Sequence, residues 1–379
     1  MAVTTVITAP RRKAASACAF TAVEFFAGIG LVRLALEKQG WKVVLANDID
    51  PDKLEIYRAN FDSKHFKLGD IHKLPANDIP TCDLFTASFP CNDLSIAGAQ
   101  KGLEGKESSA FWGLIQILRD MGDRRPPIVM LENVVGFLQS HGGKDLETAL
   151  LALGALGYAV DAFILNAARW VPQSRARLFV IAKGQTDTHD SLAMESDSRP
   201  APLTAFINLH QHIPWDIRPL PALPTPSTTL TQILEDLPED DPCWWSDERA
   251  AYFFGQLSER HLLAARQMMS SARYQYATAF RRVRKGRSMA ELRTDGIAGC
   301  LRTPRGGSGR QILFRAGKGA YRVRLLTARE CARLQGVDDD YVINVSVNQA
   351  LFGFGDAVCV PVIRWIAENY LTPLAATLH

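Results

Sequence analysis

One cysteine in this sequence stands where a nucleophile could be presented to a substrate. Cys91 directly follows a proline in the segment SFPCNDLSIAG (residues 88–98), at the end of an apolar run. Free cysteine is among the most buried residue types, so this position by itself favours a place in the core. A thiol used in covalent catalysis needs neighbours that favour the thiolate and move protons, and the sequence offers candidates.

A carboxylate and two arginines are the candidate neighbours. Glu132 comes directly after a further apolar run, and Gln173, Arg175 and Arg177 alternate in the segment QSRAR. Alternate residues of an extended strand point to one face, so the two arginines share a face. Each group also has a plain structural interpretation, as a helix cap, a surface ion pair or a core thiol. Together they would place a thiol, a carboxyl group and two guanidinium groups at one site.

A glycine turn near the start of the chain suggests a nucleoside-binding site. The segment FFAGIG (25–30) is typical of a strand that enters a tight turn, where glycine lets the backbone approach a ligand. Asp48 lies twenty residues after Gly28, at the end of a second apolar run, where an acid can bind ribose hydroxyls. Asp70 is a second such acid. The turn lacks both GxGxxG and a phosphate-binding Lys-Ser/Thr pair, which favours S-adenosylmethionine over NAD or ATP. The alternative is that these are turn and capping residues only.

The elements that must position these residues follow from the apolar pattern. Short buried strands are predicted at 22–26, 42–46, 83–87, 128–131 and 178–182. Helical stretches separate them, including one that Asp50 caps with Pro51 at its first position. Strands that alternate with helices predict an α/β fold with a doubly wound, mostly parallel sheet. In such a sheet, ligands bind at the carboxyl ends of the strands.

The remainder of the chain differs in charge and composition. Residues 184–250 are rich in Pro, Asp, Ser and Thr and hold twelve acidic and three basic residues, so a domain boundary is expected there. Residues 273–324 hold fourteen Lys and Arg and two acidic residues, with aromatic residues between them. Such a stretch could neutralise nucleic-acid phosphates, and pairing with the acidic stretch is the alternative. Helices are predicted at 257–272, 327–335 and 360–370.

Bulk properties narrow the class of protein. The chain has 379 residues, of which 47% are hydrophobic and 22% charged, as in a globular protein of about two domains. Its seven cysteines are scattered and form no CxxC pair, which argues for a reducing compartment and against a zinc site. No long apolar segment or signal peptide is apparent. We therefore expect a cytoplasmic protein with no metal and no membrane partner, and a monomer.

In this order, the motifs resemble those of the C5-cytosine DNA methyltransferase family. The resemblance covers nearly the whole chain outside 184–295 and rests on FFAGIG, SFPCNDLSIAG, LENV, QSRAR, YRVRLLTARECARLQG and FGFGDAV. The sequence departs from the family at two places. Asn92 stands where Gln is usual, and Asp356 stands where Asn is usual.

The resemblance implies a Rossmann-like, S-adenosylmethionine-dependent fold and a covalent mechanism. Cys91 would add to C6 of a cytosine flipped out of duplex DNA, which makes C5 nucleophilic toward the methyl group and leaves S-adenosylhomocysteine as product. Glu132 would donate to N3 and accept from the exocyclic amine. Arg177 would bind O2, with Arg175 supporting the loop or a phosphate.

Composition and the same resemblance together assign domains and further site residues. The composition indicates a flexible basic arm at 1–20 and a boundary at 184, and the resemblance then implies a catalytic and cofactor-binding domain at 21–183, a smaller target-recognition domain at 184–319 and a return segment at 320–379. The predicted cofactor-binding residues are Phe26, Ala27, Gly28, Gly30, Asp48, Ile49, Asp70, Ile71, Pro90, Asp356 and Ala357, with Glu24 near the amino-acid end. The predicted DNA contacts are Ser95, Gln173, Arg281, Arg282, Arg284, Arg305 and Arg310.

Two other functions remain open from the sequence. A tRNA cytosine-5 methyltransferase would carry the same catalytic motifs, although the long, partly basic 184–319 region favours double-stranded DNA. A non-catalytic DNA-binding regulator could keep the fold, although the intact Cys91, Glu132 and Arg177 argue against it. An enzyme acting on exocyclic amines would need an Asp/Asn-Pro-Pro-aromatic loop, which we do not find. A cognate restriction endonuclease or other defence proteins are the expected partners, and the recognition sequence is not predicted.

Overall fold

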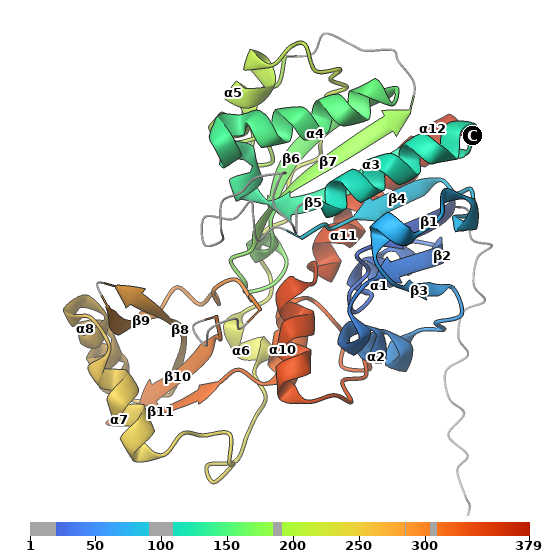
Figure 1. Cartoon of the computed structure of the whole chain (residues 1–379). Coiled ribbons are helices and arrows are strands. Elements are labelled where there is room, and N and C mark those ends of the chain that lie inside the picture. The colour runs from blue at the N-terminus through green and yellow to red at the C-terminus, as the bar shows by residue number, and fades with distance from the viewer. Residues whose placement is uncertain (1–19, 91–108, 185–191, 285, 304–308) are drawn as a thin grey trace, which may run out of the picture.

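The computed structural model describes residues 20–90, 109–184, 192–284, 286–303 and 309–379, arranged as two domains (Figure 1). The predicted nucleophile, Cys91, lies outside the described residues. The same holds for Ser95, for Arg305, for the Arg284 side chain and for the predicted arm up to residue 19.

The larger domain is built on a seven-stranded sheet in the order β3-β2-β1-β4-β5-β7-β6. Its strands are β1 (Phe20–Phe25), β2 (Trp41–Asp48), β3 (Phe66–Leu68), β4 (Leu84–Ala87), β5 (Ile128–Val134), β6 (Tyr158–Asn166) and β7 (Ala176–Gly184). All neighbours pair in parallel except β7, which runs antiparallel to both β5 and β6. The mostly parallel sheet is confirmed. Two strands of this sheet, β3 and β6, are not among the strands predicted from the apolar runs.

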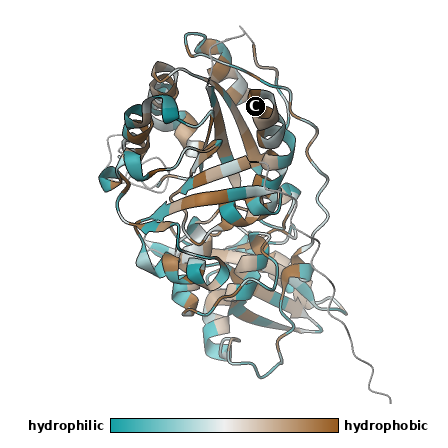
Figure 2. Cartoon of the chain, turned by 90° about the vertical axis from the view of Figure 1, so that its right-hand side faces the viewer, coloured by the Kyte–Doolittle hydropathy of each residue, from teal (hydrophilic) through white to brown (hydrophobic). Residues whose placement is uncertain are grey.

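Helices cover both faces of this sheet, as a doubly wound fold requires. One face packs against α1 (Leu31–Glu37), α2 (Pro51–Asn60) and the C-terminal helices, and the other packs against α3 (Ala110–Met121) and α4 (Lys144–Ala155). The strands between them are mostly apolar, with polar residues interspersed (Figure 2), because a sheet buried on both faces has no solvated side. The predicted cap of α2 is confirmed, since the Asp50 carboxylate accepts the backbone N–H of Asp52 and Pro51 opens the helix.

The end of the chain returns to the larger domain as three consecutive helices. They are α10 (Val347–Asp356), α11 (Val360–Ile366) and α12 (Thr372–Leu378). Among the described residues, the helical stretch Val347–Leu378 is the one whose length and apolarity would suffice to cross a membrane, and 72% of its most apolar window is buried inside the protein. Its hydrophobicity therefore serves packing against β1 and α1.

The smaller domain is an antiparallel sheet covered by two helices. Its strands run in the order β11-β10-β8-β9, and its core lies against α7 (Asp247–Gly255) and α8 (Glu259–Met269). The strands are β8 (Gln275–Arg284), β9 (Arg287–Arg293), β10 (Ile312–Gly317) and β11 (Ala320–Leu325). Because β10 and β11 pair along their full length, the boundary predicted at 319–320 falls inside a hairpin, and the domain ends near Leu325 instead.

The boundary predicted at residue 184 is also displaced. Helix α5 (Ala201–Leu209) and the segment after it pack on the larger domain, with Phe206 and Trp215 buried in its core. The acidic, proline-rich composition of this stretch concealed a few large apolar residues that bury well. The smaller domain therefore begins after α6 (Leu230–Ile233), near the start of α7. Helix α9 (Ala328–Leu334) follows it, within the helix predicted at 327–335, and a capping box between Thr327 and Glu330 opens it.

Candidate active site

The order of the strands places a topological switch point between β1 and β4. The chain winds outward from β1 in one direction through β2 and β3, and from β4 in the other through β5. At such a switch point the loops after the two central strands separate and leave room for a ligand. The loops here are the glycine turn at residues 26–30 and the segment Ser88–Pro90. Pro90 lies at the last described position before Cys91.

The glycine turn is held by Asp48. One oxygen of its carboxylate accepts the backbone N–H of Gly28 at 2.7 Å, and the other accepts that of Asp50 at 2.9 Å. Ala27 adds a bond from its N–H to the carbonyl of Asn47 at 2.9 Å. Burial raises the pKa of the Asp48 carboxyl, although Lys53 and these two N–H groups oppose the shift. Asp48 thus fixes the turn from the end of β2.

The two glycines of the turn serve different purposes. Gly28 has a φ of 55°, and an added Cβ there would make only ordinary contacts, with Lys53 and the Phe26 carbonyl oxygen at 3.9 Å. Gly30 has a φ of 83°, but an added Cβ would lie 2.6 Å from the ring of Phe61 and 2.9 Å from that of Tyr57. The backbone is therefore less crowded at Gly28 than at Gly30. The absence of a side chain at Gly30 allows α1 to pack on α2.

The neighbouring strand ends offer surfaces that suit an adenine nucleoside. Ile49 follows β2 and is 67% exposed, which is unusual for a large apolar residue at the carboxyl end of a core strand. Phe26 adopts a φ of 56°, a left-handed conformation that is costly for a bulky residue. Asp70 follows β3 and caps the short helix that begins at Ile71, whose side chain is buried. An apolar surface, a carboxylate and a glycine turn are the groups that S-adenosylmethionine requires.

Glu24 lies deeper than its predicted role would require. Its side chain is 1% exposed, and it accepts the backbone N–H of Arg33 at the start of α1. Burial raises the pKa of this carboxyl to about 8, although Arg33 opposes the shift. The group is therefore sealed beneath the turn.

Glu132 and Arg177 form an ion pair at the carboxyl edge of the sheet. Glu132 lies inside β5, rather than after it as predicted, and is 7% exposed. Arg177 pairs in register with Val134, so it is the diagonal neighbour of Glu132 on the same face. Its Nε lies 3.0 Å from Oε1 of Glu132. Because β7 runs antiparallel, its beginning reaches the edge where the parallel strands end.

The segment that leads to Cys91 is tied to the same place. Ala87, the last residue of β4, pairs with Leu131, so the chain leaves the sheet beside Glu132. The side-chain amide of Asn133 donates to the carbonyl oxygen of Phe89 at 3.3 Å, two residues before Cys91. Phe89 is itself buried against Phe111 and Phe137.

Gln173 and Arg175 brace the site from within. The Arg175 guanidinium is buried and donates to the carbonyl oxygens of Leu301 at 2.9 Å and Ala357 at 2.6 Å. Gln173 is fully buried, donates to the carbonyl of Leu334 and accepts the N–H of Leu301. Its amide is therefore used inside the protein and does not face a ligand, contrary to the predicted DNA contact. Arg175 instead joins the segments at Leu301 and Ala357, and its support of the loop or of a phosphate stays a prediction.

A second cysteine contacts both arginines, and the sequence pattern did not indicate it. The sulfur of Cys300 lies 3.3 Å from Nη1 of Arg175 and 3.7 Å from Nη2 of Arg177. Burial would raise the pKa of this thiol, but the two arginines outweigh it and lower the pKa to about 7. More than 120 residues separate Cys300 from the QSRAR segment, so no local spacing could reveal the contact.

The end of α10 and the residues after it pack against the carboxyl edge of the sheet beside the glycine turn. Asp356 accepts a bond from Lys53 at 2.8 Å, which joins the end of α10 to α2 beside the glycine turn. Ala357 contributes its carbonyl oxygen to Arg175. The backbone of Arg302 and Thr303 passes so close to Gly355 that an added Cβ there would lie 2.6 Å from it.

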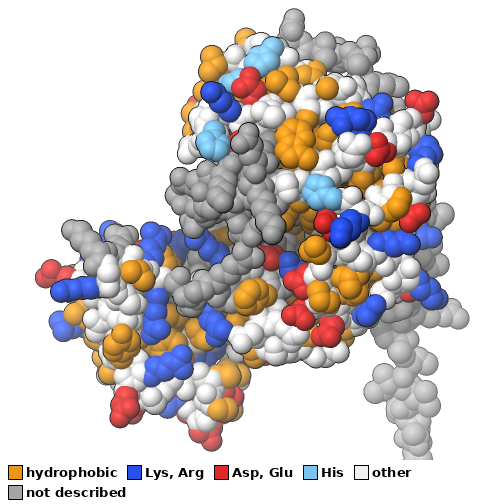
Figure 3. Space-filling view, viewed as in Figure 1, with side chains coloured by type: hydrophobic (Ala, Val, Ile, Leu, Met, Phe, Trp, Pro, Cys, Tyr) orange, Lys and Arg blue, Asp and Glu red, His pale blue; other side chains and the backbone are white. Residues whose placement is uncertain are grey.

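The smaller domain presents basic side chains toward a hollow between the domains (Figure 3). Arg282 on β8 has a 53% exposed side chain and lies 3.7 Å from Glu291. Arg281 stacks on Trp245 with its guanidinium carbon 5.4 Å from the ring centroid. Arg310 is bonded to Asn348 of α10 at 2.5 Å, so it also ties the two domains together.

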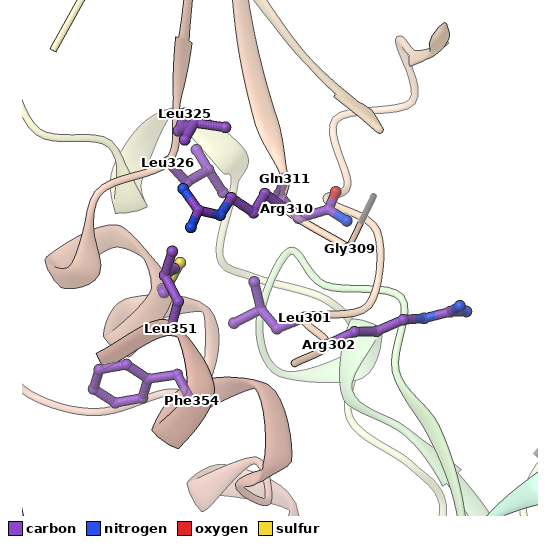
Figure 4. Close-up of a pocket in the computed structure, with 10 residues that line it drawn as sticks. Leu301, Arg302, Gly309, Arg310, Gln311, Leu325, Leu326, Leu351 and Phe354 are labelled. Atoms are coloured by element: carbon purple, nitrogen blue, oxygen red, sulfur yellow. The ribbon is translucent and has the colours of Figure 1, made fainter. Parts of the chain in front are cut away.

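An apolar cavity lies where the domains meet (Figure 4). Its lining includes Leu301, Leu326, Leu351 and Phe354 from both sides of the junction. The Arg302 side chain, which is exposed, points away from this cavity.

Comparison with known proteins shows which family this sequence resembles. A family model described as C-5 cytosine-specific DNA methylase matches residues 20–372. The type II methyltransferase M.DsaV of Dactylococcopsis salina is 30% identical over 356 residues, which cover 94% of this chain and 87% of that protein. The type II methyltransferase M.HhaI of Haemophilus parahaemolyticus is 28% identical over 354 residues, which cover 92% and 93% respectively.

Solved structures share the fold. The S. pombe Dnmt2 methyltransferase aligns with a TM-score of 0.62 at 19% identity, over 94% of this chain and 99% of that one. A putative DNA modification methyltransferase encoded within an E. coli prophage aligns with a TM-score of 0.56, also at 19% identity, over 95% and 99%. These likenesses support the arrangement of the two domains.

Proposed function

Because this chain belongs to the family of C-5 cytosine-specific DNA methylases, we propose that Cys91 is its nucleophile and that Glu132 and Arg177 hold the target cytosine. The chain is a sequence-specific DNA (cytosine-5-)-methyltransferase. One observation supports the residue assignment above the others. The bond from Asn133 to Phe89 anchors the segment that leads to Cys91 on the strand that carries the Glu132–Arg177 pair.

The proposed chemistry divides the work among these three side chains. The Cys91 thiolate adds to C6 of the flipped base, and the electrons of the C5–C6 double bond become available at C5. Glu132 shares a proton with N3, which moves to the ring as the sulfur adds and so offsets the developing charge. Arg177 has five N–H donors, enough to keep its bond to Glu132 and also to reach O2. After methyl transfer, loss of the C5 proton expels Cys91.

The methyl donor of this class of enzymes is S-adenosylmethionine, which supplies an electrophilic methyl group. We assign its adenine to the surface between Phe26 and Ile49, with Asp70 accepting from the amine. We assign its ribose to Asp48. Both oxygens of that carboxylate already accept backbone N–H groups, but each has a second lone pair for a hydroxyl. The less crowded backbone at Gly28 suits the methionine part.

DNA is the substrate, and we propose that the duplex lies in the hollow between the domains. The flipped cytosine would then enter the larger domain, while the half-exposed Arg282 of β8 contacts the duplex. Arg281 lies on the opposite face of β8, over Trp245, and so takes a less direct part. Extruding the base costs a few kcal/mol, which the phosphate and groove contacts offset. Arg310 takes part less directly, since it is bonded to α10.

Bisulfite sequencing of DNA from a bacterial host that expresses the chain tests this function. We expect methylated cytosines at one short recurring sequence, and none in a host that expresses the Cys91→Ala variant. Purified protein assayed in parallel on duplex DNA and on tRNA separates the alternatives. Methylation of tRNA only would make the chain a tRNA methyltransferase, and DNA binding without a methylated product would make it a regulator.

The type II names of the relatives belong to restriction-modification enzymes, and we propose the same setting here, in the cytoplasm of a bacterial cell. The expected partner is an endonuclease that cuts the same sequence. Methylated DNA that remains fully sensitive to a nuclease encoded beside this chain would contradict that partnership.

A further inference from the structure

Cys300 belongs to a cluster of four side chains, whose other members are Glu132, Arg175 and Arg177. The Cys300 sulfur is within hydrogen-bond distance of Nη1 of Arg175 at 3.3 Å and of Nη2 of Arg177 at 3.7 Å. Arg177 in turn holds Glu132. Cys300 comes from the segment between β9 and β10, and the other three come from β5 and from β7 and its approach. Two guanidinium groups on one sulfur create a positive field that favours the thiolate.

The proposed methyl transfer gives this thiol no task, because Cys91 is the nucleophile. The Cys300 side chain is intermediate between buried and exposed. Arg302, two residues further along the chain, has an exposed side chain and adds a third positive charge. A partly exposed thiol among positive charges is the environment in which cysteines react with electrophiles. We propose that Cys300 is a modification site, at which small oxidants and electrophiles such as hydroperoxides act and thereby disable Arg177.

The chemistry of the modification balances with the peroxide as oxidant. The Cys300 thiolate attacks one oxygen of hydrogen peroxide, an S–O bond forms and the O–O bond breaks, and hydroxide leaves. The sulfur has then lost two electrons and is a sulfenic acid. A low-molecular-weight thiol can displace the hydroxyl group as water and leave a mixed disulfide, which a second thiol reduces.

The contacts explain why such a change would reach the active site. Converting the sulfur to a mixed disulfide removes the negative charge that faces Arg177 and inserts a bulky group between β7 and the Cys300 segment. Arg177 would then lose the position that aligns it with Glu132. This consequence for methyl transfer rests on the proposed role of Arg177, whereas the reactivity of the thiol does not.

Competitive labelling with iodoacetamide tests the reactivity of the Cys300 thiol. The full chain with the Cys91→Ser substitution is used, and the exposed Cys243 of the same chain is the internal control. Burial and Asp241 raise the pKa of Cys243. At pH 7 Cys300 therefore has a much larger thiolate fraction than Cys243, although the lower nucleophilicity of a low-pKa thiol offsets part of this advantage. We expect Cys300 to be labelled about fivefold faster, as measured by mass spectrometry of its peptide.

The pH dependence is the sharper signature. The labelling rate of Cys300 should level off above about pH 8, because the pKa of its thiol lies near 7. The charged groups around the sulfur are Arg175, Arg177 and Arg302, with Glu132 on the far side of Arg177. Labelling of Cys243 should still rise at pH 9. The Arg302→Gln variant should slow the labelling of Cys300 at pH 7 and leave that of Cys243 unchanged. A Cys300 rate that rises in parallel with Cys243 up to pH 9, or that never exceeds it, would overturn the proposal.

A peroxide assay tests the effect on catalysis separately. Wild type and Cys300→Ser are treated with hydrogen peroxide and glutathione, and each is compared with its own untreated methyl-transfer activity. We expect a larger fractional loss in the wild type, restored by dithiothreitol. Equal fractional losses would mean that another thiol carries the inhibition, and the regulatory part of the proposal would fall even if the labelling result held.

Discussion

Nε of Arg177 lies 3.0 Å from Oε1 of Glu132, although 45 residues separate the two in the chain. The diagonal register between antiparallel β5 and β7 brings them together on one face. If Glu132 moves the proton to N3, Glu132→Gln keeps the shape of the side chain but removes that proton transfer. We expect kcat to fall by about 10²–10³-fold while the Kd for DNA changes little.

Glu55→Gln, on the exposed side of α2, is the matched control and should keep full activity. If Glu132→Gln retains more than about a third of the wild-type kcat, Glu132 has no catalytic role and the ion pair is structural.

Asp48 offers a test of the cofactor assignment. Asp48→Asn can still accept the N–H of Gly28, but it loses the charge and the second acceptor oxygen, which holds the N–H of Asp50. We expect the Kd for S-adenosylmethionine, measured by calorimetry at a temperature where the variant is folded, to rise about tenfold or more, together with a lower melting temperature. Asp52→Asn, four residues further along the chain, should leave the Kd unchanged. Equal affinity in the wild type and Asp48→Asn would remove Asp48 from the binding site.

Arg282 is suited to a test of DNA contact, because its side chain is half exposed on β8. If it contacts a phosphate, Arg282→Gln should reduce the slope of log K against log salt by about one and weaken binding to all sequences equally. If it reads a base, sequence preference should relax by about 1–3 kcal/mol at one position. Arg260→Gln on α8 serves as control. No change in slope or in preference would exclude Arg282 from the interface.

The buried Glu24 predicts a pH dependence of stability. Its folded pKa of about 8 exceeds the ordinary value of 4.5, so the folded state binds the extra proton between these values. The stability that this group contributes is present below pH 4.5 and is lost as the pH rises toward 8. Glu24→Gln removes the loss. Relative to the wild type, the variant should gain up to about 1.4 kcal/mol per pH unit within this window.

Denaturant unfolding at pH 5, 6, 7 and 8 measures this difference. The exposed Glu55→Gln should track the wild type at every pH. A constant difference between Glu24→Gln and the wild type across the series would show that the carboxyl does not titrate as its burial requires.

Local patterns predicted most of the larger domain. Apolar runs with helices between them predicted β1, β2, β4, β5 and β7, and the Asp50–Pro51 pair marked the start of α2. Strand β6 escaped because Asp161 interrupts its apolar run. That carboxylate is buried only because Arg199 and Tyr370, from distant segments, donate to it. Sequence patterns do not report such long-range compensation.

Parts of the candidate site were beyond prediction for the same reason. The alternation of Arg175 and Arg177 indicated a shared face, but not that one would be buried against the backbone of Leu301 and Ala357. Gln173 was expected to reach DNA and instead joins internal segments. The contact between Cys300 and the two arginines depends on how the smaller domain attaches to the larger one.

The central claim, that Cys91 bonds to the target base, is tested most directly by trapping the adduct. Fluorine at C5 cannot leave as a proton does, so duplex DNA with 5-fluorocytosine at the recognised position should stall after methyl transfer with the sulfur still attached. We predict a stable protein–DNA adduct whose mass maps to the peptide that contains Cys91, and no adduct with Cys91→Ala, which should still bind DNA. An adduct on another residue, or methyl transfer by Cys91→Ala at a near-normal rate, would contradict the account.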